Sequence, residues 1–233
     1  MSDHAGLALA TLAFVGTHLA LSHPLRMRLV QTIGEQLFLG LYSAVAAVTF
    51  LWMILAFRAI DYSPNYWSAP EWVWWIGSAV MLAASVLLVG SLVRNPAFPH
   101  PGAKPDAQPK PWVPAGVFAI TRHPMNWSFI LWALVHIAVW GSPRNLIVAG
   151  GILALALVGS LGQDHKKLNT LGQPWRDWMA RTSFVPFGAL LAGRVPWRAA
   201  VPDWRVALAG LALWLAVTSF HAREASPVWA LLR

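Results

Sequence analysis

The stretch LFLGLYSAVAAVTFLWMILAF, residues 37–57, decides the fold class. It runs for twenty-one residues without a charged side chain, which is the length that a transmembrane α-helix needs. Its apolar residues are continuous rather than alternating, and this argues against a strand of a membrane β-barrel. Backbone amides in lipid must be hydrogen-bonded within the membrane-spanning structure, and a helix achieves this within one segment. We therefore expect a helix that crosses a membrane.

Similar apolar segments lie on both sides of this stretch, and prolines and glycines separate them. They are residues 5–22, 72–93, 125–141, 146–162 and 206–220. The fourth and sixth segments in chain order are short for a bilayer. The fourth either begins before Pro124 as a broken helix or does not cross fully. The sequence therefore predicts an all-α, polytopic integral membrane protein with about six transmembrane helices, forming a single domain over residues 1–233.

Composition supports lipid as the solvent and excludes several kinds of site. Hydrophobic residues make up 57% of the chain and charged residues 11%, whereas a soluble domain usually has about 25% charged residues. The net charge of +8 does not indicate nucleic-acid binding, because the basic residues lie in short segments between the apolar ones. The chain has no cysteine, so disulfides, thiolate metal ligands and covalently attached haem are excluded.

The basic residues also predict the orientation. Thirteen of the seventeen lysines and arginines follow the first, third and fifth segments, which places those loops in the cytoplasm and both termini on the outer, periplasmic side of a bacterial-type inner membrane. The thirteen are Arg26, Arg28, Arg94, Lys104, Lys110, Arg122, Lys166, Lys167, Arg176, Arg181, Arg194, Arg198 and Arg205.

Two loops differ in character. Residues 95–114 are rich in proline and polar side chains and are expected to be irregular. Residues 163–182 have helical spacing, with an apolar stripe opposite charged residues, and predict an amphipathic helix at the cytoplasmic interface. The stripe comprises Leu168, Leu171, Trp175, Trp178 and Met179.

Histidines are the candidate functional residues. Ionisable groups within a membrane segment are costly and mark functional sites, and His18 and His136 lie inside the first and fourth segments. The alternative for each is a hydrogen bond to a neighbouring helix. His23 and His123 each precede a proline at a segment boundary, where they could instead cap a helix or pair at headgroup level. Because no Asp or Glu lies at the midplane, two neutral imidazoles fit a b-type haem better than a proton relay.

Motifs along the chain resemble those of the NnrU family. They include Thr17-His18, Leu21-Ser22-His23-Pro24-Leu25-Arg26, Ile33-Gly34-Glu35, Arg94-Asn95-Pro96, Ile120-Thr121-Arg122-His123-Pro124-Met125, Leu131-Trp132-Ala133-Leu134 with His136, Gly159-Ser160 through Gln163-Asp164, Arg181-Thr182-Ser183 and Pro186-Phe187. The resemblance covers nearly the whole chain.

The resemblance implies a haem b site. Bacterial members of the family are associated with nitrite and nitric oxide reduction in denitrification. The plant members are 15-cis-ζ-carotene isomerases, which isomerise a central cis double bond with haem b. Their haem ligands match His18 and His136, which are therefore the expected iron ligands and catalytic residues. The plant pattern has a cysteine, implicated in redox-dependent ligand switching, where this chain has Ala133.

Other residues compete for or assist this expected site. His18 lies near the cytoplasmic end of its segment and His136 near the outer end of its own. Their levels therefore differ by about 10–15 Å at 1.5 Å per residue. His123 is closer in depth to His18 and is the main competing ligand. Arg122 is expected to pair with a haem propionate or an anionic headgroup. His23 completes the candidate cofactor-binding residues.

Three functions follow as hypotheses. One is isomerisation of a lipophilic polyene that enters from the bilayer. Another is a redox or accessory role in nitrite and nitric oxide reduction. The third is a methyltransferase-like role, because Arg122-His123-Pro124, Asp164, Gly172-Gln173 with Trp175, and Pro186 are similar to the S-adenosylmethionine pattern of membrane methyltransferases. Those enzymes usually have a glutamate near the position of Asp164, and this chain lacks it.

Overall fold

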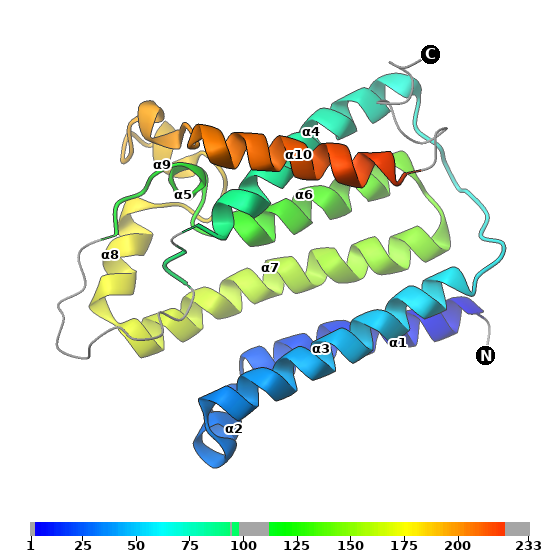
Figure 1. The fold of residues 1–233 in the computed structure, drawn as a ribbon, viewed down its shortest axis with the longest axis horizontal. Helices are drawn as coiled ribbons and strands as arrows, with labels where there is room; N and C mark the ends of the chain where they lie inside the picture. Colours follow the sequence, from blue (N-terminus) through cyan, green and yellow to red (C-terminus); the bar gives the residue numbers. More distant parts are fainter. Residues whose placement is uncertain (1–2, 94, 98–111, 222–233) are drawn as a thin grey trace. The chain divides into compact units, whose positions relative to one another are not determined.

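The computed structural model describes residues 3–93, 95–97 and 112–221, and within these the chain forms helices joined by loops (Figure 1). The helices are α1 (Asp3–Ser22), α2 (Arg26–Ile33), α3 (Glu35–Arg58), α4 (Glu71–Ser91), α5 (Val117–Ile120), α6 (Pro124–Val139), α7 (Pro143–Leu171), α8 (Gln173–Arg181), α9 (Gly188–Leu191), the 3₁₀-helix η1 (Trp197–Ala200) and α10 (Trp204–Ser219). The all-helical prediction is confirmed for this part of the chain.

The six apolar segments form α1, α3, α4, α6, α7 and α10. Four of these, α1, α3, α4 and α7, are long and apolar enough to cross a membrane, whereas α6 and α10 are shorter apolar helices. Helix α6 begins at Pro124, and the extended residue Thr121 (φ −153°, ψ 151°) separates it from the short helix α5. Proline at the first helical position suits a helix start, since the amide it lacks would have no partner there.

The prediction of one amphipathic helix over residues 163–182 is wrong. Helix α7 continues to Leu171, and Gly172, at φ +62°, separates it from α8. The apolar side of α8 does not face lipid, because Trp175 and Trp178 are 0% and 2% exposed and meet the ring of Trp112 edge to face. An apolar stripe indicates burial on one side, and it does not distinguish lipid from protein. Of the predicted basic loop residues, Arg94, Lys104 and Lys110 lie outside the described part of the chain, as does most of the loop expected to be irregular.

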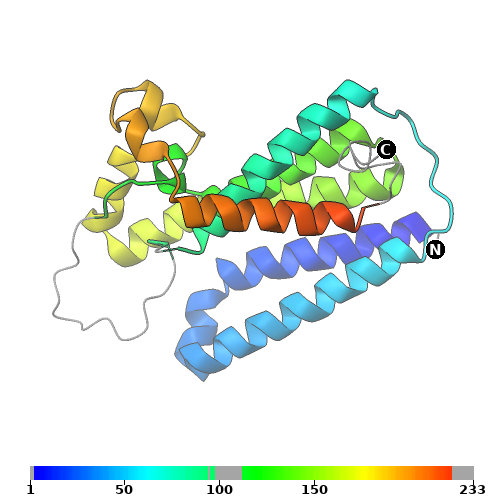
Figure 2. The same ribbon diagram turned by 45° about the horizontal axis from the view of Figure 1, so that its top comes forward.

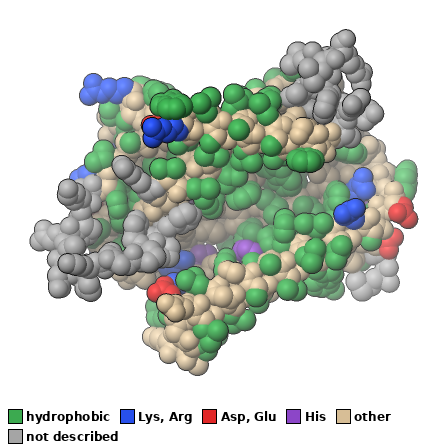
Figure 3. Space-filling view, in the orientation of Figure 1, with side chains coloured by type: hydrophobic (Ala, Val, Ile, Leu, Met, Phe, Trp, Pro, Cys, Tyr) green, Lys and Arg blue, Asp and Glu red, His purple; other side chains and the backbone are tan. Residues whose placement is uncertain are grey.

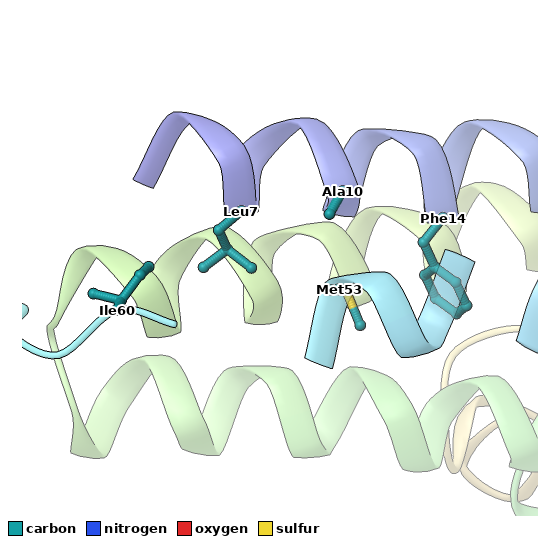
Figure 4. Packing of buried hydrophobic residues seen from close by; sticks show 5 residues of the cluster. All are labelled: Leu7, Ala10, Phe14, Met53 and Ile60. Atoms are coloured by element: carbon teal, nitrogen blue, oxygen red, sulfur yellow. The ribbon is translucent and has the colours of Figure 1, made fainter. Parts of the chain in front are cut away.

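The chain divides into two compact units, and the first comprises residues 1–77 and 129–162. Its core joins α1 to α3 through Leu7, Ala10, Phe14, Met53 and Ile60 (Figure 4). Residues of α7 pack against this cluster, namely Ile147, Val148, Ile152 and Leu155.

Glycines in α7 fix its register against α1. A Cβ at Gly151 would come within 2.3 Å of Thr11 Cγ2, and one at Gly162 within 2.5 Å of the His23 ring. Helices α1 and α7 therefore run in the same direction. At one end of this unit the His4 ring bonds Ser63 Oγ (3.1 Å), and Arg144 donates to the Ile60 carbonyl (3.2 Å).

The second unit comprises residues 78–128 and 163–233. Helices α4 and α10 run antiparallel in close contact, because a Cβ at Gly210 would meet Val86 and one at Gly90 would meet Val206. Trp214 also donates to the Ser78 carbonyl (3.1 Å). A small cluster of Ala119, Ala189, Leu190 and Val195 joins α5 to the segment between α8 and α10 (Figure 2).

Much of the surface is apolar. Leu12 and Val48 are 68% and 67% exposed, and Figure 3 shows hydrophobic side chains over much of the displayed face. Exposed apolar surface of this extent is unusual for a protein surrounded by water. It fits helices whose outer faces contact lipid.

The close approach of α1 and α7 can be tested at two neighbouring glycines. Gly151→Ala should lower the free energy of unfolding by about 1–3 kcal/mol, because its methyl group overlaps Thr11. Gly150→Ala is the matched control, since nothing lies within 4 Å of a Cβ there, and it should be neutral or stabilise by up to about 1 kcal/mol. Unfolding in detergent measures both, and equal stability of the two variants would contradict the register.

Candidate functional site

His18 lies on α1 among aromatic rings of the first unit. Its ring centroid is 4.4 Å from that of Phe14, one turn earlier, and 5.4 Å from that of Tyr42 on α3. The Tyr42 hydroxyl in turn accepts from Ser22 Oγ (3.2 Å). His18 is partly buried, so it lies on a face of α1 that α3 covers in part.

His136 has a similar setting on α6. Its ring stacks on Trp132, one turn earlier, at 4.2 Å between centroids. It is also partly buried, and Ala133 on the preceding turn is 0% exposed. Both candidate ligands thus lean toward the N-terminus of their own helix and rest on an aromatic ring.

Hydrogen bonds set the tautomer of both imidazoles. Nδ1 of His18 lies 3.1 Å from the Phe14 carbonyl, and Nδ1 of His136 lies 2.8 Å from the Trp132 carbonyl. A carbonyl oxygen can only accept, so each Nδ1 carries the proton and each neutral ring has its lone pair on Nε2. Ligating histidines commonly have this arrangement, with the other ring nitrogen bonded to a carbonyl or carboxylate. The donor chemistry of both residues therefore fits haem iron.

The two histidines differ in level along the unit. The register of α1 against α7 places His18 close to the level of residue 158, in the fifth turn of α7. Asn145, in the first turn of α7, donates to the His136 carbonyl (2.8 Å) and places His136 near the start of that helix. The two α-carbons are thus separated by about 20 Å along the helix direction, at 1.5 Å per residue.

The lean of the rings reduces this difference. Helix α6 runs antiparallel to α7, which follows it after a short turn, and α1 runs parallel to α7. Because side chains lean toward the N-terminus of their helix, the rings of His18 and His136 lean toward each other's level. Ligation of one iron by both residues would still require α1 and α6 to shift toward a common level.

His23 occupies a different position. It follows α1, and its ring lies over the backbone of Gly162, where a Cβ would come within 2.5 Å. This contact is possible because residue 162 has no side chain. In the structure His23 packs against α7 at the end of the first unit.

A buried polar cluster lies in the second unit, around the carboxylate of Asp164 on α7. Arg122 donates to Asp164 Oδ2 from both Nε (2.8 Å) and Nη2 (2.6 Å), and Trp175 of α8 donates to Oδ1 (3.3 Å). The side chains of Arg122 and Asp164 are only 10% and 9% exposed. The guanidinium that the sequence assigns to a propionate or a headgroup is thus engaged by this carboxylate.

His123 completes the cluster. Its side chain is fully buried, Nδ1 lies 3.0 Å from Gln163 Oε1 and Nε2 lies 3.1 Å from Asp164 Oδ1. With Nδ1 donating to Gln163, Nε2 carries a proton toward the carboxylate only when the imidazole is charged. His123 is therefore held by its neighbours on two sides.

Backbone contacts clasp this cluster to the segment after α8. Thr121 Oγ1 donates to the Phe184 carbonyl (2.7 Å), and the Arg122 amide donates to the Ser183 carbonyl (2.9 Å). Trp127 Nε1 also donates to the Phe184 carbonyl (2.8 Å). The start of α6, the end of α7, α8 and residues 183–184 therefore meet around one carboxylate.

The structure thus groups the predicted residues in two sets. His18, His23 and His136 belong to the first unit, and Arg122 and His123 to the second. Within the described residues, no group of three or more histidine, aspartate or glutamate side chains could hold a metal ion. The contact of Tyr42 with His18 and the hydrogen bonds of Thr121 to Ser183 and Phe184 could not be predicted, because neither residue type marks its partner in the sequence.

The ion pair at Asp164 makes a stability prediction. Asp164→Asn should lower the free energy of unfolding by about 3–5 kcal/mol, because it leaves the buried Arg122 guanidinium without a counter-charge. Asp177→Asn is the control, since Asp177 is exposed on α8 and accepts a hydrogen bond from Gln173, which is also exposed, and it should change stability by less than about 0.5 kcal/mol. Denaturant unfolding compares the two, and similar stabilities would show that the pair is dispensable.

Comparisons with known proteins found one matching family model and two similar proteins. A family model described as NnrU protein matches residues 6–225. The chloroplastic 15-cis-zeta-carotene isomerase of Zea mays is 30% identical over 79 residues, which cover 34% of this chain and 22% of that protein. The corresponding protein of Arabidopsis thaliana is 32% identical over 79 residues, with the same coverage. The chain thus matches less than a quarter of the length of these relatives.

No solved structure matches the chain. The family model extends from α1 to beyond α10 and includes both units, with all five candidate cofactor-binding residues. The chain therefore belongs to the NnrU family.

Proposed function

We propose that this protein binds haem b within the membrane and catalyses cis–trans isomerisation of a lipophilic polyene. The observation that carries the proposal is the pair of histidines, each on an apolar helix and each with Nδ1 committed to a backbone carbonyl. Membership of the NnrU family and similarity to two 15-cis-zeta-carotene isomerases support the same class of reaction.

His18 and His136 would hold the cofactor from α1 and α6. Bound there, haem b would supply a Lewis-acidic or redox-active iron. The carbonyls of Phe14 and Trp132 keep each imidazole in the tautomer whose Nε2 can ligate. Aromatic rings beside each histidine restrict its orientation and exclude water, which suits an apolar substrate.

We further propose that all six apolar helices cross a bacterial inner membrane, with the N-terminus on the periplasmic side. The end of the first unit where His4 bonds Ser63 and Arg144 bonds Ile60 would face outward. The basic residues of the second unit, among them Arg181 and Arg198, would face the cytoplasm, as the charge distribution of membrane proteins favours.

The absorption spectrum of the purified protein, oxidised and then reduced with dithionite, tests the cofactor. We expect a Soret band and b-type α and β bands, with haem content measured as the pyridine haemochrome. His18→Ala and His136→Ala should each lose or loosen the haem. His165→Ala is the matched control, because that side chain is exposed on α7 and bonds Asn169.

The single variants also test whether both histidines bind one iron. Full low-spin spectra in both single variants would refute the ligand assignment. Loss in only one variant would show that the difference in level between the two residues is not closed. A colourless protein that cannot be reconstituted with haem would instead favour the methyltransferase-like hypothesis.

Activity separates the isomerase from an accessory role. We expect cells that accumulate 15-cis-ζ-carotene to convert it when they express this protein, and to lose the conversion with His136→Ala. Chromatographic separation of the isomers measures the product. A haem-loaded protein that leaves the isomer ratio unchanged would favour the alternative of a redox or accessory role in nitrite and nitric oxide reduction.

A further inference from the structure

The segment between α8 and α10 has two different faces. Its inner face consists of Ala189, Leu190 and Val195, which are at most 5% exposed and pack with Ala119 of α5. Its outer face consists of large apolar side chains that remain exposed, and we call this set the outer apolar face: Val185 (60%), Phe187 (45%), Leu191 (76%), Trp197 (57%) and Val201 (71%). A short segment with so many exposed large side chains indicates a surface with a partner.

Backbone hydrogen bonds and a contact between two aromatic rings hold the outer apolar face in a defined conformation. Phe187 is the only described non-glycine residue with positive φ (+66°), a conformation that a side chain of its kind rarely adopts. Its amide donates to the Ile120 carbonyl (2.8 Å), and its carbonyl accepts from Leu191 (2.9 Å). Its ring lies nearly parallel to that of Trp197 (20° between planes, centroids 6.3 Å apart). The backbone thus presents the two rings together, outward.

Four arginines flank this face in the sequence or lie within the same segment. Arg181, Arg194, Arg198 and Arg205 are all exposed. Among the described residues, none of the four forms an ion pair with a carboxylate. Arg194 donates to the carbonyls of Ala180 and Thr182 (both 2.8 Å). Asp203, two residues before Arg205, accepts from the Arg205 amide as the N-cap of α10.

We propose that this segment lies at the membrane interface and binds anionic phospholipid. The outer apolar face would enter the boundary between headgroups and acyl chains, and the arginines would contact lipid phosphates. Charge complementarity favours this partner, because exposed aromatic and aliphatic side chains beside unpaired cations are typical of interfacial segments. The position of the segment in the chain also supports a place at the membrane interface. It leads directly into the apolar helix α10, whose Trp204 and Leu208 are also exposed.

Depth measurement tests the apolar part of the proposal. The chain has no cysteine, so a nitroxide can be attached to Leu191→Cys in the full-length protein within lipid nanodiscs. Leu208→Cys on α10 is the lipid-facing reference, and Asp177→Cys on the exposed side of α8 is the aqueous reference. We expect the label at residue 191 to collide more often with oxygen than with a water-soluble nickel complex, as at residue 208.

Two other results would overturn the proposal that the outer apolar face enters the membrane interface. Frequent collision with the nickel complex at residue 191, as at residue 177, would mean that water covers this face. Rare collision with both reagents would mean that protein covers it, for example a second copy of the chain.

Lipid selectivity tests the cationic part. The association of spin-labelled phosphatidylglycerol is compared with that of phosphatidylcholine for the wild type and for Arg181→Gln/Arg198→Gln. We expect the wild type to prefer phosphatidylglycerol and each lost arginine to reduce this preference by up to about fivefold, an effect that weakens in high salt.

Arg58→Gln, at the end of α3 in the first unit, is the matched control and should keep the preference. Equal binding of the two lipids by the wild type, or an unchanged preference in the double variant, would overturn the proposal. Neither measurement depends on haem or on isomerase activity.

Discussion

The carboxylate of Asp164 is the interaction on which the second unit depends. It accepts from Arg122 twice and from Trp175 once, and it faces Nε2 of His123. A carboxylate that is 9% exposed is unfavourable unless partners replace its lost hydration. The partners here are Arg122 and His123, which directly precede α6, and Trp175 of α8. Satisfying one charge therefore fixes how the start of α6, the end of α7, α8 and residues 183–184 are arranged within this unit.

Sequence patterns predicted the helices better than the contacts between them. Apolar length alone located the starts of α1, α3, α4, α6, α7 and α10 to within a few residues, because a segment such as 37–57 has no alternative in lipid. It did not locate the end of α7, which continues to Leu171 beyond the apolar segment 146–162. Arg122 and Asp164 were both noticed, but a pair separated by about forty positions carries no periodic signal of contact. The same limit explains the error at α8, where the stripe of Trp175 and Trp178 was assigned to the membrane interface and instead packs on Trp112.

For the candidate ligands His18 and His136, the sequence predicts the local setting but not the register that sets their relative level. Their positions inside apolar segments could be recognised from the sequence, and the structure adds that both have Nδ1 bonded to the carbonyl four residues earlier. That bond is local, so it forms whether or not α1 and α6 are at a common level. The difference in level depends on the register of α1 against α7, which the small residues Gly151 and Gly162 determine. No helical pattern in either segment specifies that register.

Charge is distributed unequally between the two units, and this affects what each can do. His18 and His136 of the first unit lie beside aromatic rings, and each bonds a backbone carbonyl through Nδ1. The second unit contains the buried ion pair and the exposed arginines beside the outer apolar face. The proposed haem ligands and the proposed lipid-binding face would have opposite requirements for local charge. The two belong to different units, so we expect a defect in the proposed lipid binding to leave the proposed haem site unchanged, and the reverse.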